Sequence, residues 1–440
     1  MKDIFKQIMI EFREEAIPQP IPRDIQLPSL KSNVRKAFVY IGMRRSGKIW
    51  ALYQRMHELM ASGVDKSQLL YINFEDDRLN EVDSADFQSI LEAYWKLYPE
   101  HIDSNHVYFF FDEIAETNGW EQFIRRLLDK EKMHIYLSGS SAKLLSREIA
   151  TNLRGRTITR EIFPLDFKEY LHSKKISINS EQLLSAKQQS KFKSNLMHYL
   201  RYGGFPEVLD ATPFLHREIL QSYIDSVIFR DIIERYDIKN HTALRQFLFY
   251  CLQNATGLLS INKLYNQFKS RGISVSKDSL YEYMNYFEDA YCLFSVSIYS
   301  FSLNKTNLKP KKVYPIDAGL IAAYSIQKQD YDSTALLETT VFLGLRRDVK
   351  DIYYYHSKAG LEVDFLSVDL NGAMSLYQAA YSIKDEKTKQ REVTALLQAM
   401  SELSLTSGTI VTLEENETII IEKKTIYVVP LYVFLMKSKR

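Results

Sequence analysis

A glycine-rich stretch near the N-terminus has the residue types and spacing that bind nucleotide phosphates. The segment GMRRSGK, residues 42–48, follows a short apolar run and precedes a helical pattern. Glycines let backbone N–H groups close around phosphate oxygens, the helix adds the positive end of its dipole, and Lys48 can reach the β- and γ-phosphates. We therefore expect ATP or ADP to bind at Gly42, Arg44, Arg45, Ser46, Gly47, Lys48 and Ile49.

Ile49 departs from the usual pattern of such a loop. The residue after the lysine is normally serine or threonine, whose hydroxyl coordinates Mg²⁺. Isoleucine offers no oxygen, so the metal loses one direct ligand. Phosphate binding should survive because the backbone, the helix and Lys48 remain, whereas we expect hydrolysis to be weakened.

A second segment places two carboxylates at the end of an apolar strand. Val107–Phe111 runs directly into Asp112 and Glu113. In this arrangement Asp112 would hold Mg²⁺ through water and Glu113 would polarise the attacking water. The alternative is an acidic strand end that caps the next helix. The loop upstream favours the first interpretation.

Polar residues also follow the next strand. His134–Leu137 leads into Ser138-Gly-Ser-Ser141, where Ser138 could sense the γ-phosphate, although such residues are also common in turns. Further along, the segment Leu153-Arg-Gly-Arg156 supplies arginines. Arg156 could stabilise transferred phosphoryl charge in a neighbouring subunit, which would require a homo-oligomer, or belong to a solvated turn. Both readings stay open.

The elements that must position these residues alternate between strand and helix from Ala37 to about Leu171. Short β-rich runs alternating with helices predict a doubly wound α/β sheet. Residues 1–30 should form a helix and a proline-rich lead-in, and residues 31–175 the nucleotide-binding domain. The expected strands are 37–41, 69–74, 107–111 and 134–137, with a helix at 120–130.

Residues 176–330 have a helical pattern followed by one typical of a winged helix. Helices are expected at 260–271 and 276–290, and strands at 291–301 and 312–316. Basic residues near these elements could contact DNA phosphates. They are Lys269, Arg271, Lys277, Lys305, Lys309, Lys311 and Lys312. Acidic residues on the same helix leave a structural or protein-docking role as the alternative.

Residues 331–440 are expected to form a second α/β domain. After a helix, strands are expected at 352–356, 362–368 and 375–381, then a helix at 388–403 and strands near 409–413 and 426–429. The late apolar stretch 426–436 is too short to cross a bilayer and is interpreted as a buried strand. With a net charge of +2 and two distant cysteines, the chain is expected to be a soluble cytoplasmic protein without a membrane partner.

Several segments, in order, resemble those of prokaryotic AAA-type P-loop ATPases that carry a C-terminal DUF4143 domain. That family typically has threonine where this chain has Ile49. The matching segments are GMRRSGK, YINFEDD at 71–77, FDEI at 111–114, LSGSS at 137–141, LRGR at 153–156, FPLDF at 163–167, GGFPE at 203–207, RD at 230–231 and GLEVDF at 360–365.

The resemblance implies that residues 331–440 have a restriction-endonuclease-like fold, which places acidic groups and a lysine around Mg²⁺. Glu338, Asp364 and Gln378 match the ligand positions, but Ala380 stands at the lysine position, where a nearby lysine such as Lys384 could substitute. The alternative, which we favour, is a packed non-catalytic module in which Glu362 and Asp364 are exposed strand residues.

Three functions follow as hypotheses. The first is an ATP-binding, nucleotide-dependent switch of the AAA type, with Mg²⁺ as cofactor and ATPase activity in question. The second is a hydrolysis-poor scaffold that recognises DNA or a protein. The third is a metal-dependent nuclease. Ile49 favours the second over the first, and Ala380 argues against the third.

Overall fold

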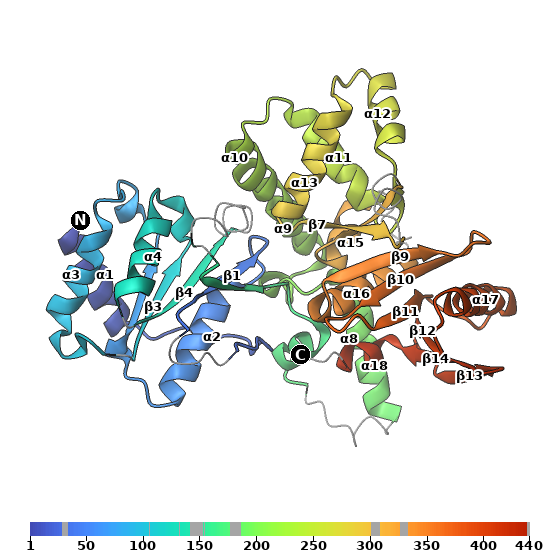
Figure 1. Cartoon of the computed structure of the whole chain (residues 1–440), viewed down its shortest axis with the longest axis horizontal. Coiled ribbons are helices and arrows are strands. Elements are labelled where there is room, and N and C mark those ends of the chain that lie inside the picture. The colour runs from blue at the N-terminus through green and yellow to red at the C-terminus, as the bar shows by residue number, and fades with distance from the viewer. Residues whose placement is uncertain are drawn as a thin grey trace. The chain divides into compact units, whose positions relative to one another are not determined.

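A computed structural model of the protein describes residues 1–28, 34–104, 106–131, 133–140, 153, 155–176, 186–300, 309–325 and 333–437. The chain forms two compact units, Met1–Phe163 and Pro164–Arg440 (Figure 1). The first unit thus ends earlier than the expected boundary at residue 175. The helix α7 (Phe167–Ser173) belongs to the second unit.

The first unit is built on a parallel sheet. Within its described residues the strand order is β2-β3-β4-β1-β5, and every neighbouring pair runs parallel. The strands are β1 (Ala37–Gly42), β2 (Leu69–Asn73), β3 (Val107–Asp112), β4 (Met133–Ser140) and β5 (Thr157–Glu161). This arrangement confirms the α/β sheet expected for a P-loop protein.

Helices cover both faces of this sheet, as the alternating side chains of β3 require. Phe110 packs in the same core as Leu52 and Met56 of α2 (Lys48–Ala61). On the other face, Phe109 contacts Tyr94 of α3 (Phe87–Leu97), and Phe111 contacts a ring of α4 (Trp120–Lys130). The N-terminal helix α1 (Lys2–Glu14) was expected, and it packs against α3.

Strand β5 was not expected from the sequence. Its residues, TITRE, are all half-buried, and it pairs with β1 at the edge of the sheet. An edge strand of this kind needs no run of apolar residues, because each of its side chains is only partly buried. The hydrophobic pattern on which strand prediction rests is therefore missing here.

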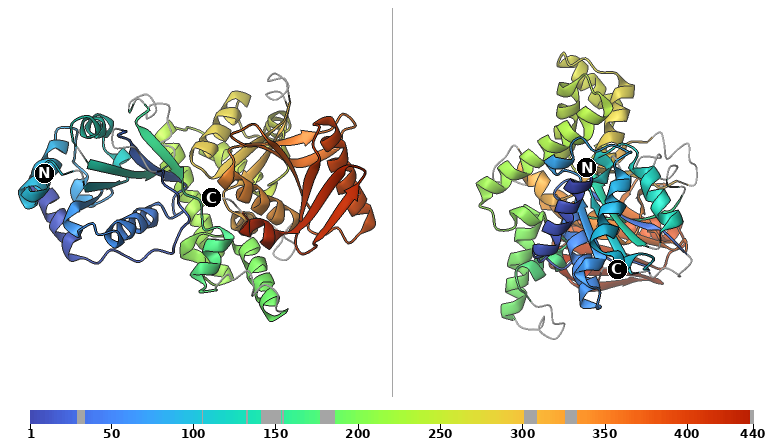
Figure 2. Two further views of the ribbon diagram at one scale, coloured as in Figure 1. Left: turned by 60° about the horizontal axis from the view of Figure 1, so that its bottom comes forward. Right: turned by 90° about the vertical axis from the view of Figure 1, so that its left-hand side faces the viewer.

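The second unit combines a helical layer with a mixed sheet (Figure 2). Its helices before the sheet are α8 (Ala186–Tyr202), α9 (Pro213–Ser226), α10 (Glu234–Tyr236) and α11 (His241–Gln253), with a π-helical segment at Val227–Ile233. Then come β6 (Leu258–Leu259), α12 (Ile261–Ser270), α13 (Lys277–Asp289), β7 (Leu293–Ile298) and β8 (Lys311–Pro315). Both helices and both strands of the pattern expected at 260–316 are thus present.

The chain continues into the segment expected to be a separate C-terminal domain. Its elements are α15 (Ala318–Tyr324), α16 (Ser333–Asp348), β9 (Asp351–His356), β10 (Glu362–Val368), β11 (Met374–Ala379), α17 (Glu386–Glu402), β12 (Ser407–Thr412), β13 (Glu417–Ile421), β14 (Lys424–Pro430) and α18 (Leu431–Met436). Most of these strands and helices match the expected ranges.

The structure does not separate residues 176–330 from residues 331–440. Strand β7 pairs in parallel with β9, with Ser297 opposite Tyr353, so one sheet crosses the expected boundary. Among the described residues its order is β13-β14-β12-β11-β10-β9-β7-β8-β6. Backbone hydrogen bonds between the two segments therefore join them into one unit.

The expectation of a buried strand over residues 426–436 was half wrong. Strand β14 ends at Pro430, and residues Leu431–Met436 form the helix α18. A short apolar run does not distinguish a buried strand from a buried helix, and proline at the junction favours a helix start. Among the described residues, we find no helix of the length and apolarity that crossing a membrane requires.

A buried carboxylate anchors the glycine pair at residues 203–204. Asp317, at the start of α15, accepts hydrogen bonds from the backbone N–H of Gly204 (2.7 Å) and of Gly319 (2.8 Å). A Cβ on Gly203, which has φ +73°, would lie 1.6 Å from Asp317 Oδ1. Burial raises the pKa of Asp317 to about 7, although these hydrogen bonds act in the opposite direction.

We expect Asp317→Asn to flatten the dependence of stability on pH. The folded protein keeps the Asp317 proton up to about pH 7, whereas an unfolded aspartate loses it near 3.8. Between these values the native state binds more protons, so stability falls as pH rises, by up to about 1.4 kcal/mol per pH unit. Asparagine cannot ionise, so this fall should be absent. Parallel pH slopes of thermal unfolding in variant and wild type would contradict the assignment.

Candidate functional site

The loop between β1 and α2 has the backbone shape of a phosphate cradle. Strand β1 ends at Gly42, and α2 begins at Lys48 after Gly47, whose φ is +101°. A Cβ on Gly42 would lie 2.1 Å from the carbonyl oxygen of Ile162, so the close approach of the two backbones requires glycine there. The loop thus ends on a helix N-terminus, where backbone N–H groups and the helix dipole favour an anion.

Lys48 turns back onto this loop. Its Nζ donates to the carbonyl oxygens of Gly42 (3.2 Å) and Met43 (3.4 Å) and lies 3.7 Å from Glu113 Oε1. Only 7% of the residue is exposed. A buried ammonium needs such partners, because an unpaired charge away from water is costly. Phosphate oxygens would be stronger partners than the carbonyls that now hold it.

The two expected carboxylates lie beside Lys48. Asp112 ends β3 and is buried; its Oδ1 accepts a hydrogen bond from Ser138 Oγ of β4, and its Oδ2 accepts one from Tyr71 Oη of β2 at 3.1 Å. Burial and the neighbouring Glu113 raise the pKa of Asp112 to about 6, whereas the hydroxyl of Ser138 acts to lower it. The structure therefore brings together Lys48, Asp112, Glu113 and Ser138.

Tyr71 is a site residue that the sequence did not single out. It is the third residue of β2 and is paired with Phe110 in the parallel register of β2 and β3. Phe110 lies two residues before Asp112 on β3. Its segment was among those that carry the family resemblance, but no local pattern shows that its hydroxyl reaches a carboxylate on the next strand. Only the register between β2 and β3 shows this.

Arg23 is a second residue that was missed. It lies in the proline-rich lead-in and is buried, and its guanidinium donates to the carbonyl oxygens of Ser46 (3.2 Å) and Phe163. Arg23 therefore stabilises the phosphate loop through a hydrogen bond to its backbone. Its position in an irregular segment left no signal in the sequence.

The remaining loop residues differ in exposure. Ser46 is fully buried, Arg44 lies 3.3 Å from Glu75 Oε1, and Arg45 is exposed with φ +65°. Ile49 lies in the first turn of α2 and is half-buried. A magnesium ion at this site would thus find carboxylates on Asp112 and Glu113 but no side-chain oxygen at Ile49.

Arg156 lies away from this group. It directly precedes β5, whose first residue pairs with Ala37, and it forms an ion pair with Asp129 of α4. The loop begins at the other end of β1, roughly 16 Å along the strand. Arg156 therefore cannot serve the nucleotide of its own chain, and its role in a neighbouring subunit stays a prediction. Arg154 and Ser141 lie outside the described residues.

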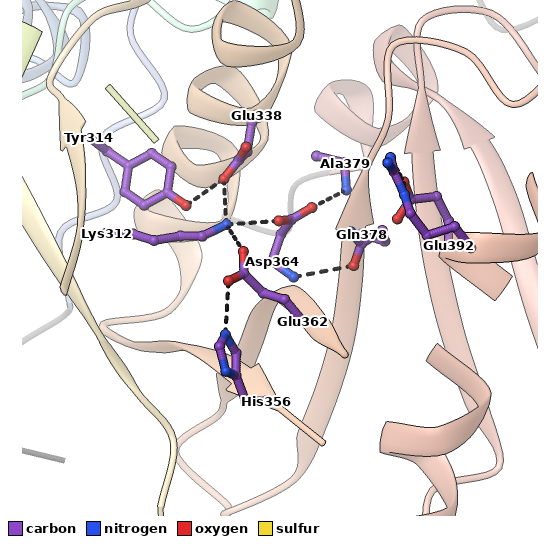
Figure 3. Close-up of polar contacts among 10 residues, drawn as sticks. Lys312, Tyr314, Glu338, His356, Glu362, Asp364, Gln378, Ala379 and Glu392 are labelled. Carbon is purple, nitrogen blue, oxygen red and sulfur yellow. Dashed lines mark hydrogen bonds and ion pairs between the residues drawn. The ribbon is translucent and has the colours of Figure 1, made fainter. Parts of the chain in front are cut away.

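The second unit contains a buried acidic cluster (Figure 3). Glu338 comes from α16, Glu362 and Asp364 from β10, and Lys312 from β8. The Lys312 Nζ lies 3.0 Å from Glu338 Oε1 and 2.8 Å from both Glu362 Oε1 and Asp364 Oδ1. The expectation that Glu362 and Asp364 are exposed strand residues was wrong, since Asp364 is buried and Glu362 is half-buried.

The prediction for Lys312 from the sequence was also wrong. It was grouped with basic residues that could contact DNA, but only 4% of it is exposed. Burial alone would lower its pKa, but the carboxylates of Asp364, Glu338 and Glu362 outweigh this and raise the pKa above its usual value. The side chains of Lys269, Arg271, Lys277 and Lys309 are exposed, and Lys305 lies outside the described residues.

Neighbouring groups complete the hydrogen bonding of the cluster. Tyr314 Oη donates to Glu338 Oε1 (2.7 Å), and the backbone N–H of Ala379 donates to Asp364 Oδ2 (3.0 Å). Gln378 Oε1 accepts from the backbone N–H of Asp364. Burial and the Asp364 charge raise the pKa of Glu338 to about 7. At the expected lysine position Ala380 is buried, and Lys384 is exposed.

Comparisons with known proteins assign a known domain family to the segment that contains the first of these two sites. An AAA domain family matches residues 34–171, and a domain of unknown function, DUF8612, matches residues 193–331. The chain is 32% identical to the uncharacterized protein MJ1544 of Methanocaldococcus jannaschii over 92% of this chain and 87% of the relative.

A second relative and a solved structure are also similar. An uncharacterized protein of Haemophilus influenzae is 32% identical over 75% of this chain and 78% of its own length. The Walker-type ATPase of Pyrococcus abyssi shares 12% identity, with a TM-score of 0.38, over 74% of this chain and 95% of that chain.

Proposed function

This chain belongs to the same family as the uncharacterized protein MJ1544 of Methanocaldococcus jannaschii and carries an AAA domain, and we propose that it binds ATP at the loop formed by residues 42–48 and acts as a nucleotide-dependent switch. The observation that carries the proposal is the position of Lys48. Its buried ammonium lies at the loop, beside the carboxylates of Asp112 and Glu113.

The ion pair between Lys48 and Glu113 suggests how nucleotide would act as the signal. A phosphate in the loop would draw the Lys48 ammonium away from the carbonyls of Gly42 and Met43 and from Glu113. Glu113 would then lose its ion pair with Lys48 and could orient a water. Mg²⁺, when bound, would neutralise charge on the phosphates. Nucleotide binding would thus change the contacts of Lys48 and Glu113.

Lys48→Ala should weaken ATP binding at least tenfold. Hydrogen bonds to charged groups contribute about 1.5–3 kcal/mol each, and the variant loses the ammonium that can reach the β- and γ-phosphates. Isothermal titration calorimetry with ATP measures the effect. Lys96→Ala, at an exposed lysine of α3, is the control and should bind as wild type does. Equal ATP affinity in wild type and Lys48→Ala would refute the proposal.

The alternative function is a scaffold that binds ATP but hydrolyses it poorly, and Ile49 is the observation that favours it. The scaffold could recognise DNA through Lys269, Arg271 and Lys277, which are exposed near α12 and α13, or a protein through the same surface. Phosphate release measured with and without DNA separates the two functions. Stimulation of phosphate release by DNA supports the switch, whereas a low rate of release that DNA does not change supports the scaffold.

A further inference from the structure

The acidic cluster of the second unit gathers around an ammonium. Lysine has three N–H donors, and three carboxylates lie 2.8–3.0 Å from the Lys312 Nζ. These distances are typical of charge-assisted hydrogen bonds, whereas Mg²⁺ ligands lie at about 2.0–2.1 Å. The geometry is therefore that of a site already filled by a cation.

The second oxygens of Asp364 and Glu362 also have protein partners, and Glu338 Oε1 has a partner besides the lysine. Tyr314 shares Glu338 Oε1 with the lysine, the Ala379 N–H takes Asp364 Oδ2, and His356 Nε2 lies 2.9 Å from Glu362 Oε2. Across the described residues, no group of three or more His, Cys, Asp or Glu side chains is arranged to hold a metal ion. The protein thus supplies many of the contacts that a metal and its waters would otherwise make.

The backbone is shaped to present Asp364 to the lysine. The pairing of β10 with β9 shifts register between Val363 and Leu366, so Asp364 lies in an irregularity of the β10 strand. Such bulges redirect side chains. On β8, Lys312 and Tyr314 are two residues apart and so point to the same face, where both reach Glu338.

We propose that Lys312 is the resident cation of the cluster formed by Glu338, Glu362 and Asp364, in place of the divalent metal that a nuclease-like fold implies. The lysine comes from the segment before residue 330 and the carboxylates from the segment after it, so the same contact also clamps strand β8 to α16 and β10. The proposal does not depend on nucleotide binding. It implies that the cluster supports no metal-dependent cleavage of DNA.

The test compares Mn²⁺ binding, followed by electron paramagnetic resonance, in nucleotide-free wild type and Asp364→Asn. We expect the two to bind the same amount of Mn²⁺, because Lys312 already occupies the cluster. Lys312→Met should bind additional Mn²⁺, and Lys312→Met/Asp364→Asn should lose it again. Binding in wild type that disappears in Asp364→Asn, or a folded Lys312→Met without additional Mn²⁺, would overturn the proposal.

Thermal unfolding supplies a second readout. Lys312→Met should unfold roughly 10 °C below wild type, because two buried carboxylates and the half-buried Glu362 lose their counterion, and Mn²⁺ should restore part of this. Lys311→Met, at the adjacent half-buried lysine, is the control and should change little. An unchanged unfolding temperature in Lys312→Met would also contradict the proposal.

A further variant keeps the test decisive if Lys312→Met does not fold. Lys312→Met/Glu338→Gln removes one charge of each sign and should fold and unfold at a higher temperature than the single variant. The comparison of wild type with Asp364→Asn remains valid in either case. Plasmid nicking by wild type that vanishes in Asp364→Asn would show a working metal site and overturn the proposal.

Discussion

We expect Ile49→Thr to raise the rate of ATP hydrolysis about a hundredfold, because it restores the missing hydroxyl. The residue lies in the first turn of α2, directly after Lys48, where a hydroxyl would supply Mg²⁺ with a direct ligand. A gain of roughly 2.7 kcal/mol in transition-state stabilisation corresponds to this factor. ATP affinity without metal should hardly change, because the backbone N–H groups and Lys48 are untouched.

Ile49→Val is the matched control. Valine and threonine have the same branched shape and similar helix propensity, so only the hydroxyl distinguishes the two variants. Steady-state phosphate release with Mg²⁺ should therefore rise in Ile49→Thr and not in Ile49→Val. Equal rates in both variants, or ordinary ATPase turnover in wild type, would show that Ile49 does not disable the enzyme.

Gly42→Ala should abolish ATP binding. The added Cβ would lie 2.1 Å from the Ile162 carbonyl oxygen, a backbone atom. That backbone cannot yield easily, because the Ile162 N–H donates to the Ile41 carbonyl at 2.6 Å. The loop must therefore move away from Ile162, which displaces the N–H groups that bind phosphate. Calorimetry should detect no ATP binding in a protein that still folds.

Gly63→Ala separates this clash from a general effect of losing a glycine. Gly63 follows the other end of α2, has φ +97°, and has open space around its Cβ position. Alanine there costs roughly 1 kcal/mol of backbone strain without touching the loop. It should lower stability slightly and leave ATP binding intact. Normal ATP affinity in Gly42→Ala would mean that the cradle tolerates the displacement.

The sequence predicted those parts of the nucleotide site that are local. Gly42, Gly47 and Lys48 lie in one continuous loop, and Asp112 and Glu113 directly end an apolar strand, so spacing alone shows their chemistry. Tyr71 and Arg23 escaped prediction because their contacts depend on strand register and on the path of an irregular segment. No periodic pattern in the sequence indicates strand register or the path of an irregular segment.

The second unit shows the same limit more strongly. Each of Glu338, Glu362 and Asp364 was noted, but Lys312 was assigned to a surface because its neighbours along the chain are basic. Its real partners are between 26 and 52 residues away. The pairing of β7 with β9 brings these two segments together. The sequence of neither strand indicates that the two are neighbours in one sheet.

That pairing also has a consequence for how the chain is made. The described strands of the first unit are all available once residue 163 has been synthesised, since β1 to β5 lie within residues 37–161. Strand β7 must wait until β9, more than fifty residues later, leaves the ribosome before its open edge is covered. Until then an unpaired strand edge is exposed to other chains. Chaperones that shield nascent strands would therefore matter most during synthesis of residues 300–356.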